Sequence, residues 1–386
     1  MDFTVIRQAY SIALRDLRVN YGACGIYAGQ QNFREYWARD GSFSMMAAAL
    51  IGDFDIVRRN LALFREHQRA DGHIPLRVEE RSHSLALVGI RLPYSGPRAR
   101  HRSSALWSTD AVDTPALYIL AGCDYAAKSG DAAWLEDNAA SMLSAAGWLL
   151  ARKNHLGLID EGLVANVADQ TFKTGSVTYT NVCVWKALTS LEAALDGRGI
   201  AGEAGALEQA ILEHLWLDDR GHFADWLGRK GKLYGHFSSD GNVLAAVFGL
   251  AGEERARRIC QYIDDHRLAE PLPLRFCHPH MDSLNDLFAR ALFRNYSTDN
   301  IFGWLGPLAA MARLEARDSQ GALADLERYA AKVVEIGTMF EVLTSCGEEV
   351  RLPYYRSERQ FAWAAASTIL AVHRLADAGV LPKDIL

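Results

Sequence analysis

The sequence has little of what marks several common protein classes. Its six cysteines form no CxxC pair and four lie inside apolar or helical runs, so free and mostly buried thiols are expected. No uncharged apolar run reaches the ~18 residues that a membrane-spanning helix needs. A net charge of −6 gives no basic surface for nucleic acid or anionic membranes. The N-terminal residues contain acids and no apolar core, so we expect no signal peptide and a cytoplasmic protein.

Phosphate-binding and metal-binding motifs are also lacking. The chain has neither GxxxxGK[ST] nor GxGxxG. The segment FCHPH places Cys277, His278 and His280 close together, but a proline separates the histidines and no second cluster matches it. We therefore interpret this segment as a loop and expect neither a metal nor a cofactor.

Strand patterns are scarce, and helical periodicity fills most of the chain. The pattern predicts twelve helices, over residues 3–19, 41–51, 54–69, 113–128, 132–152, 178–196, 202–215, 241–250, 253–265, 299–315, 319–335 and 359–377.

The predicted helices alternate in character. The even-numbered ones are apolar on nearly every face, as in SFSMMAAALIG, and must be buried on every face. The odd-numbered ones are amphipathic: in the helix over 54–69, Ile56, Val57, Leu61 and Phe64 share one face.

The connections alternate as well. Short turns, often a glycine followed by an acidic residue, come after the apolar helices, and long loops come after the amphipathic ones. Six apolar helices inside six amphipathic helices would place all the long loops at one end. The sequence thus predicts an all-α fold, an (α/α)6 barrel forming a single catalytic domain over 1–386, with one site at the long-loop end. An irregular all-α protein or an open solenoid is the alternative.

Aromatic rings, carboxylates and an arginine gather in these loops and in the first turns of the apolar helices. Such groups suit a neutral polyhydroxylated ligand, because sugar faces stack on aromatic rings and hydroxyls need paired donors and acceptors. The sequence predicts a small saccharide or glycoside bound by Trp37, Arg39, Asp40, Trp107, Asp110, Asp113, Asn300, Trp304, Tyr355 and Trp363. The same loops hold Asn166, Asp240, Asp299, Glu358 and Phe361.

Two loop carboxylates are candidates for catalysis. Glu341 follows an apolar pair, and Asp169 has mostly apolar residues before it, an environment that raises a carboxyl pKa. The loops before the sixth and twelfth helices face each other across a ring of six pairs. Asp160 and Glu161 lie in the same loop as Asp169 and are alternatives for the acid.

Simpler roles compete with these interpretations. Four aspartates precede predicted apolar helices and could be plain N-caps, each worth ~1 kcal/mol: Asp40, Asp113, Asp240 and Asp299. Arg39 and Asp40 could also form a local charge pair.

Five segments resemble those of the (α/α)6-barrel glycoside hydrolases, a superfamily that includes glucoamylases, amylo-α-1,6-glucosidases of glycogen debranching and neutral invertases. They occur in the same order, namely YWARDGSFSMMAAALIGD, AVDTPALYILAGCDYAAKSGD, GLIDEGLVANVADQTFKTGSVTYTNVCVWKAL, NIFGWLGPLAAMARL and the stretch from FEVLTSCG to FAWAAASTILAVHRL. The debranching pattern has Trp-Met-Asp where this chain has Val167-Ala168-Asp169.

The resemblance implies an exo-acting, inverting glycoside hydrolase on an α-glucosidic or related linkage, with Asp169 as general acid and Glu341 as general base. It also implies that Arg39 and Asp40 hold the terminal sugar in a subsite lined by Trp37, Asp113 and Trp304. Since no β-domain precedes the first helix, a short substrate is expected. Two other functions stay open, a non-catalytic saccharide-binding relative and a sugar 2-epimerase that uses histidines, with His73, His236, His278 and His373 as candidates.

Overall fold

The computed structural model describes residues 3–83, 92–103, 108–168, 171–279, 299–352 and 355–386. Within these ranges the chain is rich in helix and has little sheet. Twelve α-helices fall in the described part, each overlapping one predicted from the sequence.

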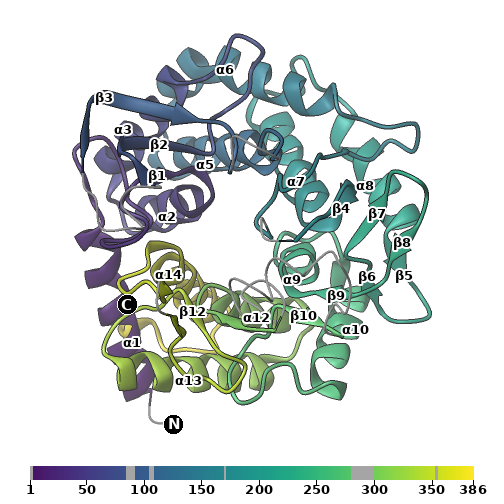
Figure 1. Cartoon of the computed structure of the whole chain (residues 1–386). Coiled ribbons are helices and arrows are strands. Elements are labelled where there is room, and N and C mark those ends of the chain that lie inside the picture. Colours follow the sequence, from purple (N-terminus) through teal and green to yellow (C-terminus); the bar gives the residue numbers. More distant parts are fainter. Residues whose placement is uncertain (1–2, 84–91, 104–107, 169–170, 280–298, 353–354) are drawn as a thin grey trace.

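Six helices form an inner ring (Figure 1). Each contacts the next in the cyclic order α2, α5, α7, α9, α12 and α14, and α14 contacts α2. Nearly every residue in their first turns is buried, as expected for helices that are apolar on all faces. Their bounds are Ala38–Leu50, Asp113–Ser129, Thr178–Ala194, Ser239–Val247, Leu305–Glu315 and Ala362–Asp377.

Six further helices cover the outside of this ring (Figure 1). They are α1 (Thr4–Val19), α3 (Phe54–Glu66), α6 (Ala132–Leu150), α8 (Glu203–His214), α10 (Gly252–Asp265) and α13 (Ser319–Ile336). Each packs against one or two inner helices, for example α3 against α2 and α5. The four apolar residues predicted on one face of α3 are all buried.

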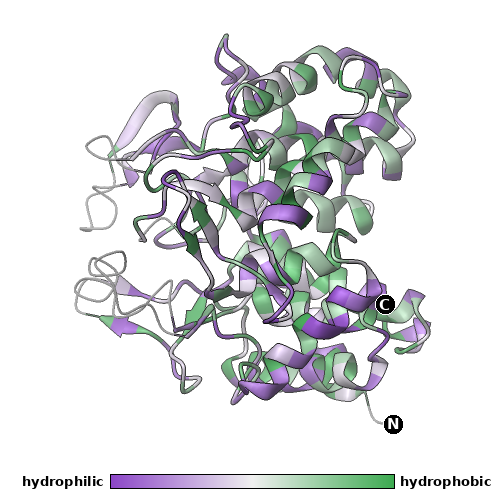
Figure 2. Ribbon diagram, turned by 90° about the vertical axis from the view of Figure 1, so that its right-hand side faces the viewer, coloured by the Kyte–Doolittle hydropathy of each residue, from purple (hydrophilic) through white to green (hydrophobic). Residues whose placement is uncertain are grey.

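Short strands accompany the long loops at one end of the ring (Figure 2). They are β1 (Tyr36–Trp37), β2 (Arg77–Arg81), β3 (Pro93–Arg100), β4 (Gly175–Val177), β5 (Trp216–Leu217), β6 (His222–Phe223), β7 (Trp226–Gly228), β8 (Leu233–Tyr234), β9 (Phe237–Ser238), β10 (Cys277–His278), β11 (Ile301–Phe302), β12 (Val342–Leu343), β13 (Arg351–Leu352) and β14 (Tyr355–Arg356). A 3₁₀ turn, η2 (Lys383–Ile385), follows α14. The sequence predicted none of these strands. Cys277 and His278, expected in a loop, pair with β9, and His280 lies outside the described residues.

Four inner helices begin at other residues than predicted. Helix α9 starts at Ser239 rather than 241, and α14 starts at Ala362 rather than 359. Helix α2 starts at Ala38 rather than 41, so Arg39 and Asp40 lie in its first turn. Helix α12 starts at Leu305 rather than 299, because Ile301 and Phe302 pair with β12 instead.

The N-cap interpretation of the four aspartates is wrong. The residues at the N-cap positions of α2, α5, α9 and α12 are Trp37, Val112, Ser238 and Trp304, and none forms a side-chain cap. Side-chain caps occur instead on outer helices, where Asp131 accepts from Trp134 N and Asp318 from Gly321 N. The aspartates at the inner helices are therefore available for other contacts.

Two asparagines on inner helices hold the loops that precede them. In α7, Asn181 Oδ1 accepts from Ile159 N at 2.8 Å, and its Nδ2 donates to Ile159 O at 3.0 Å. In α9, Asn242 repeats this with Phe223, at 2.8 and 3.1 Å. Each asparagine is the fourth residue of its helix and is fully buried. These tethers fix the loop ends against the ring.

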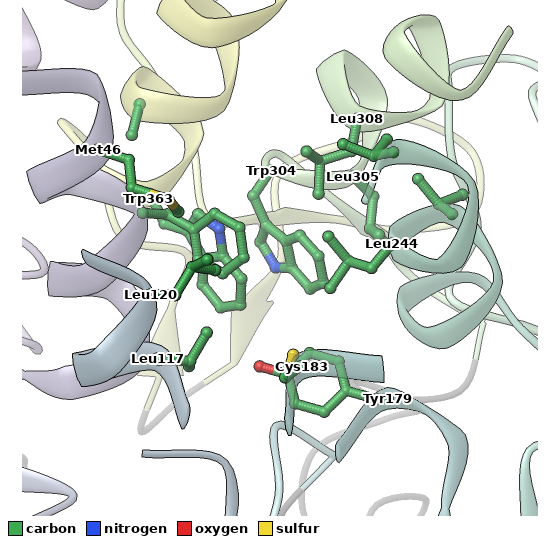
Figure 3. Close-up of a cluster of buried hydrophobic side chains, with 14 of the residues drawn as sticks. Met46, Leu117, Leu120, Tyr179, Cys183, Leu244, Trp304, Leu305, Leu308 and Trp363 are labelled. Carbon is green, nitrogen blue, oxygen red and sulfur yellow. The ribbon is translucent and has the colours of Figure 1, made fainter. Parts of the chain in front are cut away.

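Apolar side chains from all six inner helices fill the interior of the ring (Figure 3). Met46, Leu117, Tyr179, Leu244 and Leu305 come from five different helices and meet there. The six cysteines are free and four of them are buried, as the sequence predicts. No helix in the described part of the chain is both long enough and apolar enough to cross a membrane.

Candidate active site

Arg39 and Asp113 form a buried ion pair between neighbouring inner helices. Arg39 Nε lies 2.5 Å from Asp113 Oδ2, and one terminal guanidinium nitrogen lies 3.2 Å from Oδ1. The two residues are 4% and 0% exposed. The partner of Arg39 is thus on α5, 74 residues away, and this geometry fixes the guanidinium plane at the first turn of α2. Asp40, next to Arg39, is 9% exposed.

Glu161 is a buried carboxyl that is affected by the charge of Asp113. It lies in the loop before α7, where its backbone pairs with Gly175 at the start of β4. Thr180 Oγ1 donates to Glu161 Oε2 at 2.6 Å, and Asn166 Nδ2 donates to Oε1. Burial raises the pKa of Glu161 to about 8, and the charge of Asp113 adds to this rise while the two hydrogen bonds and Lys173 oppose it. A carboxyl with this pKa holds its proton at neutral pH.

Lys173 is a buried lysine that pairs with an equally buried aspartate. Lys173 Nζ is 2.7 Å from Asp225 Oδ1, and both side chains are almost inaccessible to solvent. Although burial alone would lower it, Asp225 and Asp240 raise the pKa of Lys173. Burial also raises the pKa of Asp240, whose Oδ1 accepts from Gly241 N at 2.7 Å.

Glu341 is fixed in the loop between α13 and α14. Its Oε2 accepts from Glu358 N at 3.0 Å and from the Tyr355 hydroxyl, so two predicted site residues, Glu341 and Tyr355, are in direct contact. Its carbonyl accepts from Gly303 N at 2.8 Å. Glu341 is 2% exposed, in contrast to an ordinary solvated loop residue.

Trp37 lies at the sheet that leads into α2. The Arg77 guanidinium carbon is 4.7 Å from the centre of its ring, and Trp37 Nε1 donates to Glu35 Oε2 at 3.3 Å. The His83 ring meets Trp37 edge-on at 5.3 Å. Strand β1 therefore carries an aromatic cluster at the loop end of the ring.

Trp304 and Trp363 lie in the ring interior (Figure 3). Their rings stack at 4.0 Å, and Trp363 also stacks on Phe43 at 4.9 Å. Asn300, just before β11, is buried, and its carbonyl accepts from Phe276 N. The tryptophan faces are thus occupied by other rings, and a role in sugar stacking stays a prediction.

Several buried polar atoms have no hydrogen-bond partner among the described residues, and Tyr179 Oη and Trp363 Nε1 are two of them. The Tyr179 hydroxyl lies against Cys183, and burial raises the pKa of this tyrosine. A buried donor without a partner is costly, so both atoms are suited to meet a bound hydroxyl group.

Asp110 is held by two arginines. It pairs with Arg102 at 2.9 Å and with Arg69 at 2.8 Å. Burial opposes the effect, but the two arginines lower the pKa of Asp110. With Arg152 and Arg229 it lines a cleft of about 490 Å³. Asp169 and Trp107 lie outside the described residues.

The four histidines considered for an epimerase make separate contacts. His73 pairs with His101 and Ala111 O, His278 bonds Tyr262, and His373 bonds Tyr10 of α1. His236 stacks near Trp226. His73, His278 and His373 thus bond partners in different segments, which does not favour a shared histidine site.

The fold is that of known glycoside hydrolases, although no protein-family model and no curated protein matches the sequence. A GH63 mannosylglycerate hydrolase from Thermus thermophilus, in complex with Tris and D-glycerate, has a TM-score of 0.71 at 14% identity over 94% of this chain and 99% of that chain. A glycosidase with bound glucose has a TM-score of 0.68 at 17% identity, with 99% and 100% covered.

Larger rhamnosidases share the fold as well. A rhamnosidase from Klebsiella oxytoca with rhamnose bound gives a TM-score of 0.69 at 15% identity over 97% of this chain. This chain spans 64% of that protein and 35% of a GH78 rhamnosidase from a Bacillus species. The predicted resemblance to the (α/α)6-barrel glycoside hydrolases is therefore confirmed at the level of the fold.

Sequence reasoning missed three residues of this site. Lys173, Tyr179 and Asp225 are buried polar groups that the sequence analysis did not single out. A lysine four residues after Asp169 was a usable signal, because a buried lysine needs a carboxylate partner.

Proposed function

We propose that this chain is an inverting, exo-acting glycoside hydrolase of a short saccharide or glycoside with an α-glucosidic or related linkage. The helical ring would be an (α/α)6 barrel, and residues 1–386 one catalytic domain that needs no metal or cofactor. The observation that carries the proposal is Glu161, a buried carboxyl that Thr180 and Asn166 bond and whose pKa is about 8.

In this mechanism Glu161 is the general acid. A glycosidase needs one carboxyl that is protonated at its working pH and one that is ionised. Glu161 would protonate the leaving oxygen, and the resulting carboxylate would be stabilised by Thr180, Asn166 and the charge of Lys173. The resemblance assigns this role to Asp169 instead, so the two assignments must be separated by experiment.

Glu341 is the proposed general base. Its two hydrogen bonds at Oε2 favour an ionised carboxylate, which would take a proton from the attacking water. An inverting enzyme seats that water between carboxyls ~6.5–9.5 Å apart. Arg39, Asp40 and Asp113 would bind the terminal sugar, with Tyr179 and Asp240 as further partners for its hydroxyls.

The proposal is tested with a panel of disaccharides and aryl glycosides, with the first-formed anomer followed by proton NMR. We expect hydrolysis with inverted configuration, loss of at least about 10²-fold in kcat for Glu341→Gln and Glu161→Gln, and a smaller loss for Asp169→Asn. A retained anomer would refute the inverting mechanism.

The same variants separate the alternatives. If Asp169→Asn is inactive and Glu161→Gln active, the acid is Asp169. An epimerase would leave the glycosidic bond intact and convert free sugars, and a binding protein would bind a saccharide without turnover of any substrate.

A further inference from the structure

Glu358 is a fully buried glutamate whose carboxylate is enclosed by backbone N–H groups. Gln30 N and Gln31 N donate to Oε1 at 2.9 and 2.6 Å, and Asn32 N donates to Oε2 at 2.6 Å. Burial raises the pKa of Glu358, while the backbone N–H donors at both oxygens oppose this rise because they favour the ionised form. Successive N–H groups of this kind form a specific anion nest. The Glu358 carboxylate is therefore bound by the turn over residues 29–33, which lies more than 300 residues away in the sequence.

Gly29 allows this close approach. A Cβ atom at position 29 would lie 2.5 Å from Glu358 Cγ and 2.7 Å from its carboxyl carbon. Any other residue would push the glutamate out of the nest. The turn thus provides both the donors and the space for one carboxylate.

The main chain of Glu358 holds Glu341. Glu358 N donates to Glu341 Oε2 at 3.0 Å, and Glu341 N donates to Glu358 O at 3.0 Å. One residue therefore contacts the N-terminal turn through its side chain and the proposed base through its backbone.

Neighbouring contacts join the same two segments. Asn32 Nδ2 donates to Arg356 O at 2.9 Å, and Ala362 N donates to Ala28 O at 2.9 Å. The N-terminal segment continues directly into β1 and α2, which carry Arg39. Glu341 is thus hydrogen-bonded through Glu358 to residues 30–32, and the main chain continues from these residues to Arg39.

We infer that Glu358 is a positioning residue that sets the orientation of the Glu341 carboxylate relative to the sugar subsite at Arg39. This inference rests on the proposed function, because it assigns Glu341 the role of base. Loss of the nest would release Glu358 N and let the base move. A displacement of 1 Å at a reacting group can cost about 10²-fold in rate.

The test compares Glu358→Gln, Gly29→Ala and a matched control, Glu349→Gln. In Glu358→Gln, the side-chain NH₂ group would face the backbone N–H donors of the nest, so one acceptor is lost. Gly29→Ala keeps the carboxylate, but its Cβ would clash with the Glu358 side chain. Glu349 lies in the same loop and pairs with Arg351, Arg356 and Arg359. We expect kcat to fall about 10²-fold in the first two variants with KM within about threefold, and wild-type kcat in the control.

Hydrogen exchange gives a readout that needs no substrate. In Glu358→Gln, backbone amides 30–32 and 341 should exchange faster together, while the control should leave both unchanged. Faster exchange at 30–32 alone, or a kcat equal to that of the control, would overturn the positioning role. Glu341→Gln is assayed in parallel: if that variant keeps full activity, the proposed function fails, and exchange still decides whether Glu358 couples the two segments.

Discussion

Glu161 determines how the molecule should respond to pH. With a pKa of about 8, its carboxyl is protonated at neutral pH and ionises as the solution becomes alkaline. We expect kcat/KM of the wild-type protein to fall above about pH 8, because the Glu161 carboxyl has then lost the proton that it must donate. Glu161→Gln should lower kcat by about 10²–10⁴-fold on substrates with poor leaving groups.

Leaving-group dependence checks this assignment. A dinitrophenyl glycoside needs little protonation, so its hydrolysis should be much less sensitive to Glu161→Gln than that of a disaccharide. Asp160→Asn serves as the neighbouring control, since Asp160 Oδ1 is already bound by Asn154 and Ser176. Equal losses with both substrates would contradict a role for Glu161 in protonation.

The same carboxyl should also make stability depend on pH. Its pKa is higher in the folded protein than the ordinary 4.5, so the folded state binds the proton more tightly. The stabilisation is complete below about pH 4.5 and is lost as the pH rises to about 8. Urea unfolding at pH 5 and pH 8 should show that the wild type loses on the order of 3 kcal/mol more than Glu161→Gln over this range. Parallel losses would show that Glu161 does not titrate as described.

The Arg39–Asp113 pair should be sensitive to removal of one partner. Asp113→Asn leaves the guanidinium buried without its counter-charge, a change that costs about 3–5 kcal/mol in other buried pairs. We expect a marked drop in the free energy of unfolding, measured in urea. Glu136→Gln breaks the exposed pair with Arg198 and should leave the melting temperature unchanged. A similar small effect of Asp113→Asn would mean that water reaches the pair.

Among the elements, the β11–β12 pair holds the proposed base. A Cβ atom at Gly303 would lie 2.0 Å from Phe340 O, in the segment that carries Glu341. Gly303→Ala should therefore force β11 and β12 apart, lower the free energy of unfolding by about 1–3 kcal/mol and reduce kcat. Thermal unfolding and kinetics measure both effects.

Gly147 offers a matched control for that change. It lies within α6, where an added Cβ would meet no other atom within 4 Å. Gly147→Ala should stabilise the protein by about 0.5–1 kcal/mol, because alanine is the better helix former. If Gly303→Ala and Gly147→Ala change the free energy of unfolding equally, the short distance between position 303 and Phe340 O does not determine the effect of the substitution.

The helices could be predicted because the burial of their faces determines where apolar residues occur in the sequence. The inner helices are buried on every side and read as continuous apolar runs, and the outer ones repeat every 3.6 residues. The strands are mostly two residues long, which is too short for an alternating pattern. The longer β2 and β3, with sequences RVEER and PYSGPRAR, are too polar to stand out from a loop.

The predicted site residues Arg39, Asp113 and Glu341 lie beside apolar segments that are recognisable in the sequence. The structure pairs the first two, and their role at a site stays a prediction. Their mutual contacts were not predictable, since local sequence does not reveal which distant segment is adjacent. Lys173 and its partner Asp225 are 52 residues apart, and the pKa of Glu161 depends on burial by several segments at once.

The closed ring should make the whole molecule unfold together. Trp363 of α14 stacks on Phe43 of α2 and on Trp304 at the start of α12, so it joins three inner helices. Trp363→Ala should cost about 3–5 kcal/mol and lower the midpoints of circular dichroism and tryptophan fluorescence equally. Trp216→Ala, at a half-buried residue of β5, should cost much less. Separate midpoints for the two signals would show that the ring unfolds in parts.

The asparagine tethers at Ile159 and Phe223 have an evolutionary consequence. Asn181 and Asn242 bond Ile159 and Phe223 only through the backbone N–H and C=O groups, which every amino acid except proline possesses. Mutation can therefore alter the side chains of these loops while their attachment to the helical ring is preserved. Loops attached through backbone groups can change their ligand specificity without a change of fold.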